Sequence, residues 1–334
     1  MSIPEFEGTP EFGFPSARDA GFPCLVQIAL MHYICNSRCL HCPVGRQRRC
    51  IGLSRDGEFS PSLRRFFPFE LFGAIAAEMA RYPWSILRFH GRGEPLLHPH
   101  FVDMIALAKR VGVGTVTSFT NAILLDERRT RQILDAGLDL LEMSVDAYSR
   151  DLYEYVRGTR NFDRVVRNAE NFLRERNRRG SNTRVIVSAV DSPDFQPEKD
   201  AFLRFWADRA DRVILRPYHT YGGRLPEVNR CASTEVVPCA QLWTRFSINP
   251  WGQVNACFND WADEEIVGDL NEPGASIAGI WSGVRFTEIR KAAIDGNSIL
   301  ACCRTCLATR AGWVRTYQGL LAELRAQPRN ETLN

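Results

Sequence analysis

The sequence lacks a long hydrophobic run and a strong net charge. No apolar stretch approaches the ~20 residues that a membrane-spanning helix needs. Residues 1–22 show no basic start followed by an apolar segment, so no signal peptide is predicted. The formal net charge is only +3, which gives no sign of a nucleic acid or an acidic membrane as partner. We therefore expect a cytoplasmic protein that binds neither.

Lysine is also scarce. Of the 42 basic residues, only Lys109, Lys199 and Lys291 are lysines, and the others are arginines. Arginine codons are rich in G and C, so a GC-rich genome explains this bias more simply than a functional need for guanidinium groups.

Cysteine, in contrast, is abundant, with 11 residues. Without an export signal these cysteines are not expected to form disulfides. Cysteines grouped at short spacings in such a protein more often bind metal.

Between residues 25 and 216, short apolar runs alternate with amphipathic stretches, which favours a parallel sheet covered by helices. The predicted strands are 25–30, 86–90, 115–120, 140–145, 184–190 and 213–216; the predicted helices are 69–82, 101–111, 127–136, 162–177 and 198–207. Six strands are too few for a closed eight-stranded barrel. The fold class is therefore α/β, with an open, partial (β/α)6 barrel.

The composition changes after Pro217, where Gly, Pro, Asn and Arg dominate. Such a stretch is typical of a linker or an active-site loop. We predict an irregular arm at 1–22, the partial barrel at 23–230, a small α+β domain with a hairpin and a helix at 231–310, and a C-terminal helix and tail at 311–334.

Cys35, Cys39 and Cys42 follow the first predicted strand. Active sites of parallel barrels lie at this end of the strands. A 4Fe–4S cluster usually takes four cysteines, so three leave one iron open for a small ligand. The alternative is a structural zinc site, which needs a fourth ligand; Cys50, His41 or His32 are the candidates.

Four later segments support the first interpretation, and with them the sequence resembles the radical S-adenosylmethionine (SAM) superfamily. They are His90–Pro95, Ser118–Asn121, Ser144–Asp146 and Arg157-Gly158, at or after successive strand ends. Ala122 stands where the family usually has a glycine. The resemblance implies that SAM is held by His41, Gly91, Gly93, Glu94, Ser118, Thr120, Asn121, Ser144, Asp146 and Arg157.

A second cysteine group comprises Cys239, Cys257, Cys303 and Cys306. Residues 246–254 predict a hairpin with Gly252 in its turn, and residues 280–289 predict a helix. Four thiolates can hold zinc or an iron–sulfur cluster. The arrangement resembles the SPASM extension in its shortened twitch form, which implies one auxiliary 4Fe–4S cluster. Cys302 can replace Cys303 in this set.

The chain resembles the radical SAM dehydrogenases of aminoglycoside and aminocyclitol antibiotic biosynthesis, such as those of the butirosin and spectinomycin pathways. The resemblance implies that a 5′-deoxyadenosyl radical removes a hydrogen atom from a small polyhydroxylated amino substrate. An alcohol becomes a ketone, the auxiliary cluster accepts an electron, and a flavodoxin or ferredoxin supplies the first one. Candidate substrate residues are Asp191, Arg216, Tyr218, His219 and Tyr221; His219 is the candidate base because its ordinary pKa lies near neutrality.

Three other functions stay open. Cys231, in the linker, can return a hydrogen atom and make the protein an epimerase. A peptide-modifying maturase is disfavoured, because residues 1–22 are too few for a leader-binding domain. A zinc-stabilised binding protein without catalysis is the fourth function.

Overall fold

The computed structural model describes residues 21–50, 65–221, 223–226, 228, 239–295, 297, 300–304 and 306. Most of the predicted N-terminal arm and the whole predicted C-terminal helix lie outside these residues. The domain boundaries drawn from the sequence therefore stay predictions.

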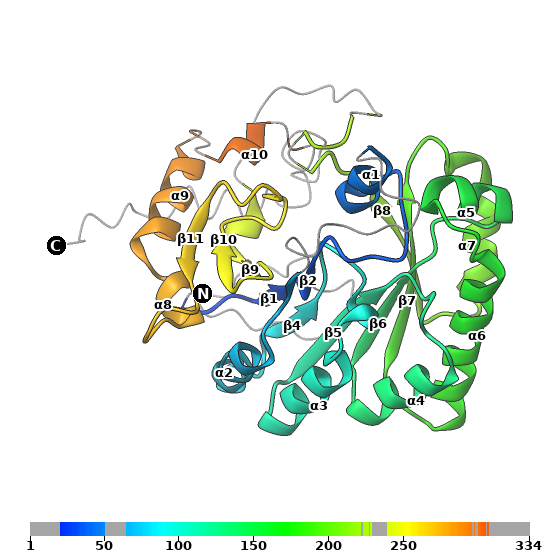
Figure 1. Ribbon diagram of the computed structural model, residues 1–334, viewed down its shortest axis with the longest axis horizontal. Helices are drawn as coiled ribbons and strands as arrows, with labels where there is room; N and C mark the ends of the chain where they lie inside the picture. Colours follow the sequence, from blue (N-terminus) through cyan, green and yellow to red (C-terminus); the bar gives the residue numbers. More distant parts are fainter. Residues whose placement is uncertain are drawn as a thin grey trace.

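Six parallel strands form the centre of the molecule (Figure 1). They pair in the order β1 (Leu25–Ile28), β4 (Ile86–Phe89), β5 (Thr115–Thr120), β6 (Leu140–Ser144), β7 (Arg184–Asp191) and β8 (Arg212–Pro217). Each lies within two residues of its predicted position. The open, partial (β/α)6 barrel expected from the sequence is confirmed.

Helices cover the outer face of this curved sheet (Figure 1). They are α2 (Phe69–Met79), α3 (Phe101–Val111), α4 (Glu127–Ala136), α5 (Arg150–Arg157), α6 (Phe162–Arg178) and α7 (Lys199–Ala207). Gly112, Gly137 and Gly158 end three of them in the left-handed conformation that glycine adopts without strain. Helix α5 was not predicted from the sequence. None of the described helices combines the length and apolar character that crossing a membrane requires.

Short elements lie in the segments that connect the strands. They are the two-stranded sheet of β2 (Met31–His32) and β3 (Arg65–Phe66), helix α1 (Pro43–Cys50), and the 3-10 turns η3 (Pro95–Leu97), η4 (Gln196–Glu198) and η5 (Ala240–Trp243).

The C-terminal segment extends the same sheet beyond β1. Strand β9 (Arg245–Ile248) runs parallel to β1, and β10 (Gln253–Asn255) and β11 (Ile266–Asp269) add to it antiparallel. The predicted hairpin is confirmed, and its turn residue Gly252 has a φ of 83°. Both cysteine groups are therefore attached to one continuous sheet of nine strands.

The helix predicted at 280–289 is wrong in its bounds. Two helices occupy this region, α8 (Ile277–Trp281) and α9 (Val284–Ile294), with α10 (Ala301–Arg304) after them. Ser282 ends α8 and Gly283 precedes α9 in an extended conformation. The apolar spacing continues across this break, so periodicity alone could not reveal it.

Side chains alternate between the two faces of each strand. Val26, Leu87, Val116, Leu141 and Val187 pack into the main hydrophobic core. On the opposite face lie buried polar side chains, namely Gln27, Arg88, Thr117, Glu142 and Ser188. A polar inner face is unusual for a packed interior, and it marks the inside of the partial barrel as a binding region.

Candidate active site

The first cysteine group lies on the loop between β2 and α1. Backbone hydrogen bonds hold this loop at two places. Tyr33 N donates to Arg92 O at 2.7 Å, and Arg38 N donates to Arg157 O at 2.9 Å. A Cβ at Gly45 would lie 2.2 Å from Cys39 N, so α1 can approach the loop this closely only with glycine there. The cysteine loop is therefore held in place by its contacts with Arg92, Arg157 and α1.

The three thiols share a buried environment. Burial raises the pKa of Cys35 and Cys42, and raises that of Cys39 to about 12 against the opposing charge of Arg157. Cys35 Sγ accepts hydrogen bonds from Ser37 N at 3.4 Å and from Asn121 Nδ2 at 3.9 Å. Such thiols lose their protons when they bind a metal. Three cysteine sulfurs on one loop, each able to bind iron as a thiolate, fit a 4Fe–4S cluster with one open iron.

Glycine is required in the segment after β4. Gly91 has a φ of 109°, and a Cβ at Gly93 would lie 2.3 Å from Ile34 O. The buried carboxylate of Glu94 accepts hydrogen bonds from Thr120 Oγ1 and Asn121 N, both at 2.7 Å. This segment therefore joins the cysteine loop to the end of β5.

The segment after β5 also contacts the cysteine loop. Besides Cys35, Asn121 Nδ2 reaches Asn36 Oδ1 at 2.6 Å. Ala122 adopts a φ of 60°, so the turn forms although the usual glycine is replaced. Ser118 Oγ donates to Phe89 O at 3.3 Å, which indicates a structural role for that hydroxyl.

Asp146, Arg157 and His41 form a buried charged group beside the cysteines. Asp146 Oδ2 lies 2.6 Å from Arg157 NH1 and 3.2 Å from His41 Nε2. Burial alone would raise the pKa of Asp146, but His41 and Arg157 outweigh it and hold that pKa well below its usual range. Arg157 Nε is buried without a hydrogen-bond partner, and the charge of the guanidinium interacts with Cys39 and Cys35. It is available to an anionic group such as the SAM carboxylate.

A cavity of about 120 Å³ lies against this loop. On one side it is lined by Cys35, Cys42 and residues 90–93; on the other side it is lined by residues of the C-terminal segment, including Ser247, Asn249, Asn255, Phe258 and Trp261. Both parts of the chain thus contribute to one site.

The second cysteine group lines a separate cavity of about 20 Å³. The structure brings the four predicted cysteines together, and Cys302 joins them; the lining cysteines are Cys239, Cys257, Cys302, Cys303 and Cys306. Burial raises the pKa of Cys239. Cys257 Sγ accepts from Asn259 N at 3.4 Å, and Cys306 Sγ accepts from Asn259 Nδ2 at 3.9 Å. This donor set fits a metal cluster held by thiolates.

The nine cysteines whose side chains the structure describes are free thiols. Within the same residues, no three His, Cys, Asp or Glu side chains are close enough to hold one metal ion. A cluster does not require that closeness, because each thiolate binds a different iron. For the zinc alternative, His41 contacts Asp146 and the ring of His32 lies 4.5 Å from that of Trp251; the side chain of Cys50 is outside the described residues.

Inside the barrel lies an ion pair that was not predicted from the sequence. Glu142 is fully buried, and its two oxygens accept from Arg216 Nε at 3.1 Å and NH2 at 2.6 Å. The Phe119 ring lies 5.5 Å from Arg88 Cζ, 5.9 Å from Arg216 Cζ and 4.1 Å from the His90 ring. The sequence feature that could have indicated this ion pair is the charged residue Glu142 within the apolar run of β6.

The other predicted substrate residues lie outside this ion pair. The His219 ring lies 5.7 Å from Tyr221 and 6.4 Å from Phe258, both of which line the larger cavity. Burial, helped by Arg245 and Arg216, lowers the pKa of His219 to about 4, so the near-neutral pKa assumed from the sequence is wrong. Asp191 contacts Gln196 and Lys199. Of the predicted substrate residues, Tyr221 lines this cavity, whereas Asp191, Arg216 and His219 do not. Cys231 lies outside the described residues.

Comparison with known families agrees with this geometry. Residues 29–188 match the radical SAM superfamily, and residues 239–307 match an iron–sulfur cluster-binding domain, SPASM. The chain carries a radical SAM domain and a SPASM domain. Its cofactors are therefore SAM, the 4Fe–4S cluster that binds SAM, and an auxiliary 4Fe–4S cluster.

Curated relatives match over shorter stretches. GTP 3′,8-cyclase from Chlorobaculum tepidum is 35% identical over 26% of this chain and 26% of its own length. A protein from Pyrococcus furiosus that modifies the cofactor of tungsten-containing aldehyde ferredoxin oxidoreductase is 33% identical over 23% and 22%. The chain thus spans about a quarter of the length of these relatives.

Solved structures share the fold over most of the chain. BtrN in complex with AdoMet and 2-DOIA has a TM-score of 0.53 at 16% identity, covering 85% of this chain and 92% of its own. Streptococcus suis SuiB bound to the precursor peptide SuiA reaches 0.63 at 12%, covering 91% and 73%. AnSMEcpe with bound AdoMet reaches 0.58 at 12%, covering 91% and 99%. At these identities, the likeness concerns the fold.

Proposed function

We propose that this radical SAM enzyme oxidises a secondary alcohol to a ketone in antibiotic biosynthesis. The proposed substrate is an aminoglycoside, an aminocyclitol or a related sugar. One observation carries the proposal: the larger cavity is lined by Cys35 and Cys42 on one side and by Phe258 on the other. Phe258 directly follows Cys257 of the second group. A substrate in this cavity would therefore lie between the two cysteine groups.

The proposed roles of the cysteines follow from this placement. Cys35, Cys39 and Cys42 hold the SAM-binding cluster, and Cys239, Cys257, Cys303 and Cys306 hold the auxiliary one. When bound, SAM and these clusters supply hydrogen-atom abstraction and an electron acceptor. Around them, Arg157 binds the SAM carboxylate, while Glu94 and Asn121 hold the segments that surround it.

The inner face of the barrel supplies groups for a polyhydroxylated amino substrate. Arg216, whose side chain is partly exposed, offers guanidinium donors, and the buried carboxylate of Glu142 orients it. His219 takes the hydroxyl proton: with a pKa of about 4 it is uncharged at neutral pH, and an uncharged imidazole has a nitrogen that can accept. Loss of one hydrogen atom, one proton and one electron from the substrate balances the oxidation of an alcohol to a ketone.

Proteins of similar fold bind both small molecules and peptides. BtrN was solved with AdoMet and 2-DOIA, whereas SuiB was solved with a precursor peptide. For this chain we propose a small molecule as the substrate, as in the BtrN complex. We propose an external flavodoxin or ferredoxin as the source of the first electron.

The test is an anaerobic incubation of the reconstituted enzyme with SAM, a reductant and a panel of aminocyclitols and aminoglycosides in D₂O. The proposal predicts a ketone two mass units lighter than its substrate. A product of unchanged oxidation state that carries one solvent deuterium would show an epimerase instead. Cys231→Ala should then abolish that product, whereas it should leave a dehydrogenase active. Turnover of peptides alone would contradict the proposal.

A further inference from the structure

Arg92 links the two cysteine groups. Its carbonyl oxygen accepts the hydrogen bond from Tyr33 N, two residues before Cys35. Its guanidinium donates to both carboxylate oxygens of Asp263, each at 2.6 Å, and to Asp260 O at 3.0 Å. One residue therefore holds the start of the first cysteine loop and the segment that follows Cys257.

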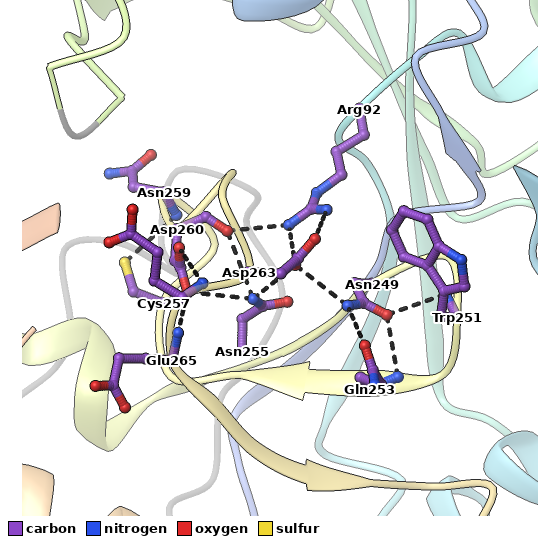
Figure 2. Close-up of polar contacts among 11 residues, drawn as sticks. Arg92, Asn249, Trp251, Gln253, Asn255, Cys257, Asn259, Asp260, Asp263 and Glu265 are labelled. Atoms are coloured by element: carbon purple, nitrogen blue, oxygen red, sulfur yellow. Dashed lines mark hydrogen bonds and ion pairs between the residues drawn. The ribbon is translucent and has the colours of Figure 1, made fainter. Parts of the chain in front are cut away.

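The far end of this link is itself firmly held (Figure 2). Asp263 Oδ1 also accepts from Asn255 Nδ2 at 2.8 Å and from Asn249 Nδ2 at 3.2 Å. The Asp260 carboxylate accepts from the backbone N–H groups of Glu264 and Glu265. Several donors thus fix two carboxylates within one short loop. A bidentate pair between Arg and Asp also sets orientation, which a single hydrogen bond does not.

Three residues of this connection have a strained backbone. Tyr33, Arg92 and Asp263 have φ values of 56°, 56° and 55°. Such left-handed values are uncommon for residues other than glycine and persist only where the surroundings enforce them. Arg92 is only 5% exposed, so its charge depends on Asp263. The strain and the buried charge are concentrated between the two cysteine groups.

The loop that Arg92 holds also shapes the cavity. Phe258 and Trp261 line it, together with Gly91 and Gly93 on either side of Arg92. The Trp261 ring lies 6.0 Å from Arg92 Cζ. A shift of this loop would therefore change the cavity wall and the surroundings of Cys257 together.

We propose that Arg92 is a positioning residue. Through its pair with Asp263, it holds the loop after Cys257 against residues 90–95, the segment expected to bind SAM. SAM binding and the geometry of the auxiliary cluster are thereby coupled. The consequence for electron acceptance from substrate rests on the function proposed above, but the coupling itself does not.

The test compares Arg92→Lys, Asp263→Asn and the double variant as reconstituted holoenzymes, without substrate. Arg176→Lys is the matched control, because Arg176 is also buried and bonded to an aspartate and a carbonyl oxygen. That pair lies where Asp211 precedes β8, at the opposite end of the strands. The readouts are iron content, KM and kcat for release of 5′-deoxyadenosine, and the electron paramagnetic resonance (EPR) spectrum of the reduced auxiliary cluster.

Both single variants should keep their iron and raise the KM for SAM about 10-fold, with kcat nearly unchanged. They should also alter the EPR spectrum of the auxiliary cluster. The KM for SAM of the double variant should be no higher than that of either single variant, because both substitutions break the same Arg92–Asp263 pair. Arg176→Lys should match the wild type.

Three results would overturn the proposal. The first is kinetics and spectra equal to those of Arg176→Lys. The second is an effect of Arg92→Lys without one of Asp263→Asn, which would mean that Arg92 acts alone. The third is loss of iron from both variants, which would make the pair part of cluster binding. If Arg92→Lys does not fold, Asp263→Asn carries the same test. Absence of a ketone from the wild type would contradict only the proposed function.

Discussion

The two cysteine sites use the same contacts to sulfur in different surroundings. In each, a backbone N–H two residues after a cysteine donates to its Sγ at 3.4 Å, and an asparagine amide reaches a Sγ at 3.9 Å. The first site adds a buried charged group, Asp146, Arg157 and His41. The second is packed among apolar residues such as Leu242, Ile289 and Leu300.

This difference fits different tasks. A cluster that binds SAM has to attract a ligand with its own charges, so charged side chains around it are useful. A cluster bound by four thiolates has no open iron and only exchanges electrons. Its potential depends on burial and on hydrogen bonds to sulfur. The predictions below test this division, from the largest expected effect to the smallest.

The largest contrast should come from removing one thiol from each site. Cys39→Ser should abolish release of 5′-deoxyadenosine, whereas Cys257→Ser should keep that release, at a higher KM for SAM, and abolish the ketone. Each variant should fall from about eight irons per chain to about four, since each site holds one four-iron cluster. Equal loss of 5′-deoxyadenosine in both would contradict the division of roles.

Removing the charge of Asp146 should weaken SAM binding. In Asp146→Asn, Arg157 and His41 lose the carboxylate that orients them, and such supporting contacts are worth about 10- to 100-fold. The KM for SAM should rise by this factor, with the auxiliary cluster unchanged. Asp163→Asn is the control, because it breaks an exposed pair with Arg150; a similar rise there would count against the interpretation.

Asn259 should tune the auxiliary cluster alone. Its amide donates to Cys306 Sγ, and a hydrogen bond to a ligating sulfur favours the reduced, more negative cluster. Asn259→Leu should therefore lower the midpoint potential by tens of millivolts, on the order of 1 kcal/mol. Redox titration followed by EPR measures this shift. Asn121→Leu should act on the first cluster instead, and a shift of the auxiliary cluster in that variant would contradict the comparison.

Mild acid should lower the stability of the barrel but not that of the second cysteine site, because all six histidines precede residue 220. Burial lowers the pKa of His98 to about 4. An unfolded chain takes up the proton near pH 6.5, so the stability that neutral His98 contributes is lost as the pH falls from 6.5 to 4. At pH 5 this loss is on the order of 1–2 kcal/mol. Urea unfolding at pH 7 and 5 should show a smaller loss for His98→Gln; an equal loss would refute this explanation.

Local patterns predicted most of the fold. The bounds of α3 and α4 were predicted from helical apolar spacing, because each helix buries one regular face, and those of β5 were predicted from its content of strand-forming residues. The break at Ser282-Gly283 was missed, since the apolar spacing continues across it. Helix α5 was missed because its eight residues give too short an apolar pattern to stand out from a loop.

The cysteines could be predicted because they lie close together in the sequence or in known motifs. The ion pairs could not. Arg216 and Glu142 are 74 positions apart, and Arg92 and Asp263 are 171 apart. No periodicity joins such residues, and only the folded sheet brings them together. The lowered pKa of His219 likewise depends first on burial and then on Arg245 and Arg216, which lie 26 and three residues away in the sequence.

The most direct measurement is a single turnover with the first cluster reduced and the auxiliary cluster oxidised beforehand. The enzyme is mixed anaerobically with SAM and an accepted aminocyclitol, frozen, and examined by EPR, and the ketone is then quantified. The proposed division of roles predicts about one newly reduced auxiliary cluster for each ketone formed, as expected for a single electron leaving the substrate radical. A ketone formed while the auxiliary cluster stays oxidised would contradict it.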